Sequence, residues 1–222
     1  MKLYFAPLAC SLATRCAVYE AGADVTFVEV DSKTKRTAEG ADYLDIHGLG
    51  LVPLLELDDG RRLAENAAIL QFIADAFPAA LLAPTDRWDR ARLQQWLSFV
   101  GSELHKPLAT LLDPAAGADR KAHARGRVEV AIAWIADQLA GREFLLERFS
   151  VADLYLFAVL NWCAVTGVDL GRWPAVASFQ KRMRQRPSCA RAFAEERELY
   201  AAELQRHGAT PEMIAALRQA AG

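Results

Sequence analysis

The chain has 222 residues, of which 53% are hydrophobic and 24% are charged, which is typical of a folded protein of one or two domains. This composition excludes a disordered or collagen-like protein, and the formal net charge of −2 argues against an electrostatic nucleic-acid binder. The longest apolar stretch, 154–168, is interrupted and falls short of the roughly 20 residues that span a bilayer. The N-terminus shows no signal-peptide pattern, so we expect a cytoplasmic protein that binds neither nucleic acid nor membrane.

Charge and cysteine usage refine this description. Residues 1–84 carry 7 basic and 12 acidic side chains, whereas residues 85–222 carry 19 and 16, which predicts two units of different composition. The four cysteines, at positions 10, 16, 163 and 189, have neither the paired spacing of a zinc site nor the density of a disulfide scaffold. We expect free thiols and no metal.

The first third of the chain alternates strand and helix patterns. A short apolar strand is predicted over 2–6, a helix over 11–21 that ends at Gly22, and an alternating, β-branched strand over 25–30. A further strand over 52–57 is followed by Asp59-Gly60, a strong hairpin signal, and by an antiparallel return over 61–64. With a helix over 67–76, the first 80 residues are predicted to form a β-α-β-α-β-β-α domain.

From Thr85 onward strand patterns give way to helical periodicity. Ser150 and Asp153 resemble a capping box, and Thr210 before Pro211 announces a last helix. The predicted helices span 86–112, 120–140, 151–166, 174–186 and 188–206. The second domain should therefore be all-helical and extend over 86–222.

Cys10 is the first candidate for chemistry, because it follows the first strand and begins the first helix. Unpaired amides and the macrodipole at a helix N-terminus favour a thiolate, so we expect a lowered pKa for this thiol. The alternative is that Cys10 is a small residue at a tight turn.

Two dipeptides are candidates for backbone and polar recognition. Val52-Pro53 opens a strand with a residue that cannot donate a ladder hydrogen bond. A cis peptide that turns the backbone of Val52 toward an extended peptide ligand would explain it, as would a plain edge-strand proline. Glu65-Asn66 begins the 67–76 helix, where an acidic residue and first-turn amides could capture the ammonium and carboxylate of a bound amino acid, or simply cap the helix.

Ser98, Ser102 and His105 occupy positions i, i+4 and i+7 of the helix predicted over 86–112. This spacing places all three on one face, with Lys106 adjacent. A lone helical histidine is more often a surface or core residue, but here it shares its face with two hydroxyls.

Together these features resemble a cytosolic glutathione S-transferase over about residues 1–200. The resemblance is greatest to the bacterial beta class, and it is carried by Met1-Lys2-Leu3-Tyr4, Cys10-Ser11-Leu12, Thr34-Lys35, Val52-Pro53, Glu65-Asn66, Trp96-Leu97 and Ser102-Glu103-Leu104-His105-Lys106. It implies a thioredoxin-like, glutathione-binding N-terminal domain over 1–80 and an all-α C-terminal domain over 86–222 that holds the acceptor-substrate pocket. It also implies a homodimer, glutathione as cosubstrate, an electrophilic small molecule as second substrate, and no further cofactor.

The resemblance also implies roles for single residues. Cys10 matches the cysteine that contacts the glutathione sulfur, Lys35 a residue near the glycyl carboxylate, and Val52 the backbone that pairs with the cysteinyl part. Glu65 and Asn66 match the γ-glutamyl contacts, and the helix that faces the tripeptide is matched by Ser98, Ser102 and His105. Trp162, Leu111 and Leu112 are weaker candidates for the acceptor pocket, since core packing explains each of them as well.

Three departures from the family pattern stand out. Asn66 occurs where many relatives have Ser or Gly, so a hydroxyl contact becomes an amide contact. The loop before Val52 reads His47-Gly48-Leu49-Gly50-Leu51 in place of the more usual Asn-Pro-x-Gly-x. Residues 201–222 go beyond the usual end, and we expect an extra helix there packed on the C-terminal domain.

Three functions follow as hypotheses. The first is a transferase that stabilises the glutathione thiolate and adds it to an electrophile, with Cys10 and His105 as catalytic residues and turnover dependent on a group that titrates near about pH 6–7. The second is a thiol-disulfide reductase that works through a Cys10 mixed disulfide with glutathione. The third is a ligand-binding protein that sequesters apolar molecules without turnover.

Overall fold

The structure is a computed structural model and describes residues 1–214 of the chain. It forms two compact units, Met1–Ala80 together with the segment from Pro187 onward, and Leu81–Arg186. The first unit ends at Ala80, and the segment from Pro187 groups with it, whereas the predicted second domain runs over 86–222. The predicted domain bounds stay a prediction.

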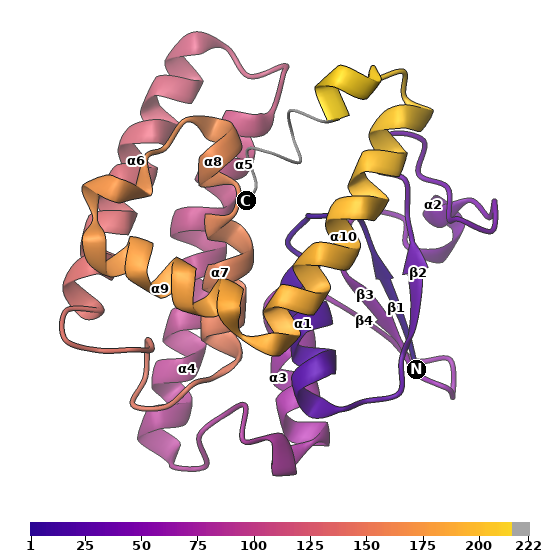
Figure 1. The fold of residues 1–222 in the computed structure, drawn as a ribbon. Helices are drawn as coiled ribbons and strands as arrows, with labels where there is room; N and C mark the ends of the chain where they lie inside the picture. Colours follow the sequence, from indigo (N-terminus) through magenta and orange to yellow (C-terminus); the bar gives the residue numbers. More distant parts are fainter. Residues whose placement is uncertain (215–222) are drawn as a thin grey trace. The chain divides into compact units, whose positions relative to one another are not determined.

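The N-terminal unit is built on a four-stranded mixed sheet in the order β2-β1-β3-β4 (Figure 1). Strand β1 (Lys2–Phe5) pairs in parallel with β2 (Thr26–Glu29) and antiparallel with β3 (Leu54–Glu56), and β3 pairs antiparallel with β4 (Arg62–Ala64). The hairpin between β3 and β4 turns at Gly60, whose φ of 84° requires a residue without a Cβ. All four strands agree with the sequence prediction.

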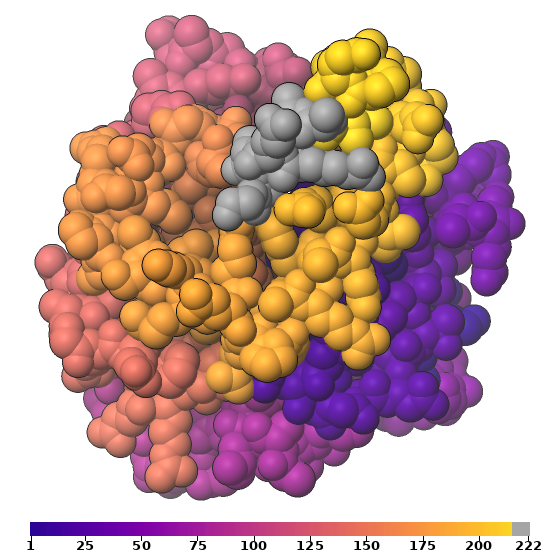
Figure 2. All heavy atoms as spheres, viewed as in Figure 1, coloured from indigo at the N-terminus to yellow at the C-terminus, as the bar shows by residue number. Residues whose placement is uncertain are grey.

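The named helices of this unit within residues 1–206 are α1 (Leu12–Ala21), α2 (Tyr43–Ile46), α3 (Asn66–Ala76) and α10 (Pro187–Arg206). Helix α1 is buried continuously from Leu12 to Val18, because α3 and α10 both pack against it. Figure 2 shows the orange and yellow atoms of α10 against the indigo and violet atoms of the first eighty residues. This double coverage explains why α1 lacks a strongly polar face, and α1 ends at Gly22 in the left-handed conformation, as predicted.

The second unit is all-helical. Its members are α4 (Arg87–Phe99), α5 (Lys106–Leu112), α6 (Ala118–Gln138), α7 (Val151–Leu160), α8 (Cys163–Thr166), α9 (Pro174–Gln185) and the turn η3 (Leu170–Arg172). Every residue of α7 is buried, so this helix forms the centre of the unit. The predicted capping box at its start is confirmed, with the Asp153 carboxylate accepting hydrogen bonds from the Ser150 amide and hydroxyl at 2.8 and 3.1 Å.

The helix predicted over 86–112 is interrupted. A wider π-helical turn, η2 (Val100–His105), separates α4 from α5. Pro107 follows directly and has no N–H to donate to the Glu103 carbonyl, so a regular α-helical ladder cannot run through this point. The predicted helix over 151–166 likewise divides at Asn161.

The short turn η1 (Pro78–Ala80) ends the first segment of the N-terminal unit. The last predicted helix begins after Thr210, whose carbonyl accepts a hydrogen bond from Ile214 at 3.1 Å, and its continuation lies outside the described residues. No helix within residues 1–214 is long and apolar enough to cross a bilayer.

Candidate functional site

Cys10 lies in the turn between β1 and α1. The turn is held by the Ser11 hydroxyl, which donates to the Ala6 carbonyl at 3.1 Å and accepts from the Ala6 amide at 3.3 Å. Leu8 adopts a left-handed backbone, with φ of 56°. The Cys10 thiol donates to the Val52 carbonyl, with a sulfur–oxygen distance of 3.5 Å, and the residue is 8% exposed. The thiol therefore lies against Val52, two residues before β3 begins at Leu54.

The expected lowering of the Cys10 pKa is wrong. Burial is the largest cause that raises the pKa of this thiol, and the carboxylates of Glu65 and Glu196 add to it, whereas the backbone amides of Cys10 and Ser11 act in the predicted, opposite direction; the net pKa is about 12. Desolvation therefore outweighs the helix N-terminus. Cys10 is a neutral thiol at pH 7 and acts as a hydrogen-bond donor.

Val52-Pro53 is a cis peptide, as the first of the two explanations for this proline expected, and the pairing of Val52 with a peptide ligand stays a prediction. The Val52 carbonyl is already the acceptor of the Cys10 thiol. The neighbouring carbonyl, that of Leu51, accepts a hydrogen bond from the Tyr43 hydroxyl at 2.8 Å. The loop before the cis peptide is thus tied to α2.

Glu65 and Asn66 lie beside Cys10, at the start of α3. Glu65 is exposed and has φ of 71°, a conformation that costs an ordinary residue about 1–2 kcal/mol and that tends to occur at ligand-binding positions. Asn66 is buried, and its side-chain amide donates to the Cys10 carbonyl at 3.1 Å. Its Oδ1 has no hydrogen-bond partner within the described residues, so this buried oxygen can accept a donor from a ligand.

Lys35 ends a tight turn after β2 and also has a left-handed backbone, with φ of 56°. Its amide donates to the Asp31 carbonyl at 3.1 Å, and its carbonyl accepts from the Tyr43 amide at 2.8 Å. The aliphatic stem of Lys35 packs over Gly50, where an added Cβ would lie 3.5 Å from the lysine Cδ. Cys10, Lys35, Val52, Glu65 and Asn66 therefore belong to one unit and are connected through adjacent loops.

The remaining predicted residues belong to the helical unit and differ in exposure. Ser98 and Ser102 are exposed, and the Ser102 hydroxyl donates to the Ser98 carbonyl at 3.0 Å. His105 is half-buried, with its Nδ1 2.8 Å from the Tyr155 hydroxyl and its ring 5.0 Å from the ring of Trp162. Of the weaker candidates, Trp162 thus contacts His105, while Leu111 and Leu112 end α5.

The expectation that His105 titrates near pH 6–7 is also wrong. Burial, and to a smaller extent the positive charge of Lys106, lower the pKa of this imidazole to about 4. His105 is therefore neutral at pH 7. Tyr155, which sequence reasoning missed, places a hydroxyl in the fully buried α7, where the only other polar side chain is that of Asp153, and such a buried polar atom needs a partner.

Sequence reasoning also missed Glu196 of α10. This residue is fully buried, and its carboxylate accepts a hydrogen bond from the Leu8 amide at 2.8 Å and lies 3.8 Å from the Arg15 guanidinium. Burial raises the pKa of Glu196 to about 8. Cys189, Phe193 and Glu196 lie at helical spacing and share the buried face of α10. An acidic residue among the apolar residues of this face was the sequence signal that could have identified Glu196.

A cavity of about 450 Å³ lies in the helical unit between α7, α8 and α9. Its lining includes the largely apolar Leu160, Cys163 and Val168 and the polar Gln180 and Arg184. Within the described residues, none of the side chains predicted for the acceptor pocket lines this cavity.

One group of potential metal ligands is present in the described part of the chain. Single ligand atoms of Asp31, Glu203 and His207 all lie within 4.8 Å of one another. His207 is hydrogen-bonded to Asp31 at 2.8 Å, Glu203 accepts from Ser32, and the Arg206 guanidinium lies 3.9 Å from the Asp31 carboxylate. The group is therefore a hydrogen-bonded network in which the Arg206 guanidinium supplies the positive charge next to Asp31.

A four-stranded mixed sheet with a thiol at the start of its first helix, followed by a cis-proline strand and an all-helical unit, defines a thioredoxin-like domain joined to a helical domain. The family models for the glutathione S-transferase N-terminal and C-terminal domains match residues 1–75 and 118–193. The chain belongs to the glutathione S-transferase family, a family of transferase enzymes.

Three relatives show how far the similarity extends. The glutathione S-transferase GstA of Escherichia coli O157:H7 is 37% identical over 198 residues, which cover 88% of this chain and 98% of GstA. The structure of a sphingomonad glutathione S-transferase complexed with glutathione is 43% identical, with a TM-score of 0.85 and coverage of 88% and 98%. A beta-class glutathione S-transferase of Sphingomonas chungbukensis is 41% identical, with the same TM-score and coverage. The predicted likeness to the beta class is therefore confirmed.

Proposed function

We propose that the enzyme binds glutathione along Cys10, Lys35, Val52, Glu65 and Asn66 and transfers it to an electrophilic small molecule. The observation that carries the proposal is the arrangement around Cys10, whose thiol donates to Val52 beside the cis-proline and whose carbonyl accepts from Asn66. A peptide strand laid along Val52 would bring its own cysteinyl sulfur to this thiol. The resemblance of the whole chain to transferases supports the same conclusion.

Each part of the tripeptide finds complementary chemistry in this unit. The cysteinyl backbone pairs with the backbone of Val52, as in strand addition. The γ-glutamyl ammonium meets the exposed Glu65 carboxylate, and its carboxylate meets the first-turn amides of α3. The Asn66 Oδ1 accepts a further donor. The Lys35 ammonium pairs with the glycyl carboxylate.

In the transfer step the glutathione thiol gives its proton to solvent water, and the resulting thiolate attacks the electrophilic carbon with its electron pair. With a chlorinated nitrobenzene, the carbon–sulfur bond forms and chloride leaves with the electrons of the carbon–chlorine bond. The neutral Cys10 thiol, whose single S–H donates to the Val52 carbonyl in the structure, turns this donor to the thiolate and stabilises it together with amides at the start of α1. For Ser98, Ser102 and His105 of the helical unit, the proposed contacts with glutathione rest on the family resemblance. His105 is a neutral imidazole that is hydrogen-bonded to Tyr155.

The competing activity is thiol-disulfide exchange through Cys10. There the Cys10 thiolate would attack a disulfide that contains glutathione, form a mixed disulfide and release the other thiolate, and a second glutathione would then release Cys10 and leave as oxidised glutathione. The raised pKa of Cys10 makes its thiolate scarce at pH 7, which favours transfer over exchange. Sequestration without turnover, the third hypothesis, requires no reactive sulfur at all.

Binding to a glutathione column, followed by assays with a chlorinated nitrobenzene and with a mixed disulfide, tests the three activities. Wild-type protein should bind the column and turn over the nitrobenzene. Cys10→Ala, which removes the hydrogen-bond donor, should reduce that turnover, whereas Cys163→Ala, a matched change of a buried thiol in the other unit, should not. Turnover of the disulfide alone would establish the reductase, and binding with neither turnover would establish a ligand-binding protein.

Further properties belong to the same proposal. We propose a homodimer, with the acidic unit of one subunit facing the basic unit of the other, and detoxification of electrophiles as the physiological role. We place the enzyme in the cytoplasm, where glutathione is abundant and its four free cysteines stay reduced.

A further inference from the structure

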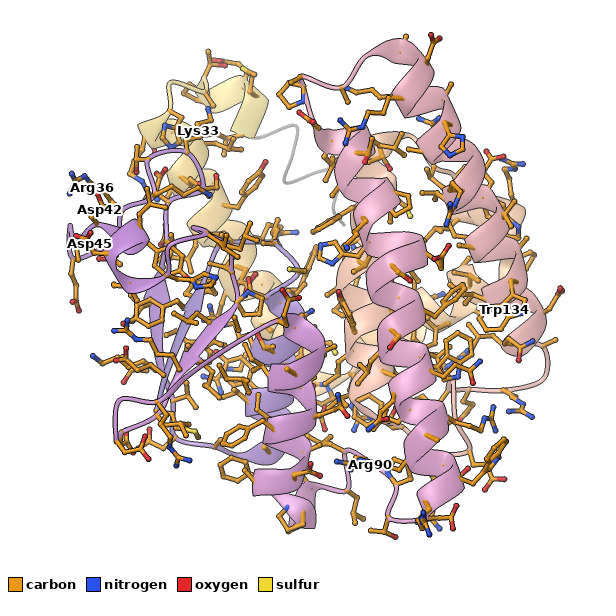
Figure 3. The ribbon with its side chains drawn as sticks, turned by 180° about the vertical axis from the view of Figure 1, so that it is seen from behind. Lys33, Arg36, Asp42, Asp45, Arg90 and Trp134 are labelled. Carbon is orange, nitrogen blue, oxygen red and sulfur yellow. The ribbon has the colours of Figure 1, made fainter. Side chains whose placement is uncertain are left out.

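The C-terminal end of α10 is bound to the turn that carries Lys35. The Glu203 carboxylate accepts hydrogen bonds from both the amide and the hydroxyl of Ser32, at 2.8 and 2.6 Å. His207 Nε2 lies 2.8 Å from the Asp31 carboxylate. Figure 3 shows the labelled Lys33, which follows Ser32, beside the pale yellow end of α10. Two side chains far along the chain therefore hold two consecutive residues of this turn.

The held residues in turn determine the backbone at Lys35. The second oxygen of Asp31 accepts from the amides of Lys33 and Thr34, at 3.0 and 2.8 Å, and its main-chain carbonyl accepts from the Lys35 amide. Burial raises the pKa of Asp31, but the hydrogen bonds from Thr34 and His207 outweigh it and bring the pKa down to about 2. The carboxylate is therefore ionised, and both of its oxygens take part in hydrogen bonds. Because Lys35 sits in the left-handed region, its backbone needs such support from its neighbours.

Family membership does not assign these residues a role. The matched domain models cover residues 1–75 and 118–193, so Glu203 and His207 lie outside both. The sphingomonad structure is covered at 98% by 88% of this chain, which leaves about an eighth of this chain without a counterpart there. The contacts of α10 with the Lys35 turn are therefore to be explained from this chain alone.

We propose that Glu203 and His207 are positioning residues that set the Lys35 turn for the glycyl carboxylate of glutathione. The proposal rests on the proposed function, because it takes Lys35 as the partner of that carboxylate. The two side chains act through Ser32 and Asp31 and touch neither glutathione nor the reacting sulfur. Their removal lets the turn relax from the left-handed conformation, so that Lys35 no longer points consistently at the carboxylate.

A dipeptide probe separates this positioning role from a general structural one. γ-Glutamylcysteine has the γ-glutamyl and cysteinyl parts of glutathione but lacks the glycyl residue. Calorimetric titration of wild-type protein should give tighter binding of glutathione than of the dipeptide. In Glu203→Ala and His207→Ala, we expect glutathione affinity to fall fivefold or more while dipeptide affinity stays within twofold.

Conservative variants and a matched control sharpen the test. Glu203→Gln and His207→Gln keep a hydrogen-bonding group toward Ser32 and Asp31 and should restore glutathione affinity to within twofold. Gln205→Ala changes an exposed residue on the same turn of α10 and should leave both affinities unchanged. In steady-state assays the alanine variants should raise KM for glutathione with kcat within twofold. The double variant Lys35→Ala/His207→Ala should bind glutathione no more weakly than Lys35→Ala alone.

Several outcomes would overturn the proposal. Equal losses of glutathione and dipeptide affinity would assign α10 a purely structural role, and unchanged glutathione affinity in both alanine variants would remove any role. If an alanine variant fails to fold, Ser32→Ala, which deletes one of the two bonds to Glu203, must still weaken glutathione about twofold and leave the dipeptide unaffected. Wild-type protein that binds neither probe would refute the proposed function and the positioning role together, whereas wild-type binding with insensitive variants refutes the positioning role alone.

Discussion

His105 gives the sharpest pH test, because its buried imidazole resists protonation only while the protein is folded. In the unfolded chain the pKa of a histidine is near 6.5, whereas burial and Lys106 lower that of His105 to about 4 in the native state. A lowered native pKa stabilises the protein above the unfolded value, and this stability is lost as the pH falls from 6.5 toward 4. His105→Gln retains a hydrogen bond to Tyr155 and removes the titration.

The magnitude follows from the two pKa values. A shift of about 2.5 units corresponds to about 3 kcal/mol once the pH is below both values, and at pH 5 the share already lost is about 2 kcal/mol relative to pH 8. Urea denaturation of both proteins at pH 8 and pH 5 measures it. The wild type should lose about 2 kcal/mol more than His105→Gln between these pH values, since all other titrating groups are shared.

Parallel losses of stability in the two proteins would show that His105 titrates normally. The reasoning from burial would then be wrong, and the earlier expectation of turnover governed by a group near pH 6–7 would be restored. A pH profile of kcat/KM for the wild type provides an independent check, because a neutral His105 predicts no inflection between pH 6 and 7 from this residue.

Three further predictions concern the N-terminal unit and the assembly. Cys10, at 8% exposure against 1% or less for the other cysteines, should react fastest with iodoacetamide, at a rate that rises with pH, and faster labelling of Cys163 in folded protein would contradict this. Because Glu196 has a pKa raised to about 8, wild-type stability should fall as the pH rises from about 4.5 through 8, and Glu196→Gln should flatten this fall; identical slopes in the two proteins would place a normal carboxyl there. Light scattering at micromolar concentration should give twice the chain mass of 24.4 kDa, and a monomer mass would refute the dimer.

Most of the fold could be predicted from local patterns of a few consecutive residues. The apolar run over 2–6, the alternation over 25–30, the Asp59-Gly60 hairpin and the Ser150 capping box are local signals, and the structure confirms the strands, the hairpin and the capping box. The sequence allowed two explanations of Val52-Pro53, a cis peptide and an edge-strand proline. Only the residues that surround the proline in the folded protein determine which of the two forms, and the structure has the cis peptide. The site residues gathered by the N-terminal unit lie at the ends of these locally specified elements.

What the sequence could not supply depends on contacts between distant segments. Helix periodicity shows that α10 buries a face but not which partner covers it, so the pairing with α1 was missed. The pKa shifts of Cys10 and His105 were misjudged because helix termini are visible in a sequence, whereas the depth of burial is not. The π-helical turn before Pro107 had a local signal, but the spacing of Ser98, Ser102 and His105 suggested an uninterrupted helix.

The return of α10 to the sheet has a consequence for how the chain is made. During synthesis the first 80 residues leave the ribosome long before the segment that covers α1, and Arg15 meets its carboxylate partners Glu195 and Glu196 only when α10 has emerged (Figure 1). Until then, the face of α1 that α10 covers and the guanidinium of Arg15 remain exposed to solvent. The helical unit, which is contiguous, can close first. The domain that begins the chain is therefore the one that finishes folding last.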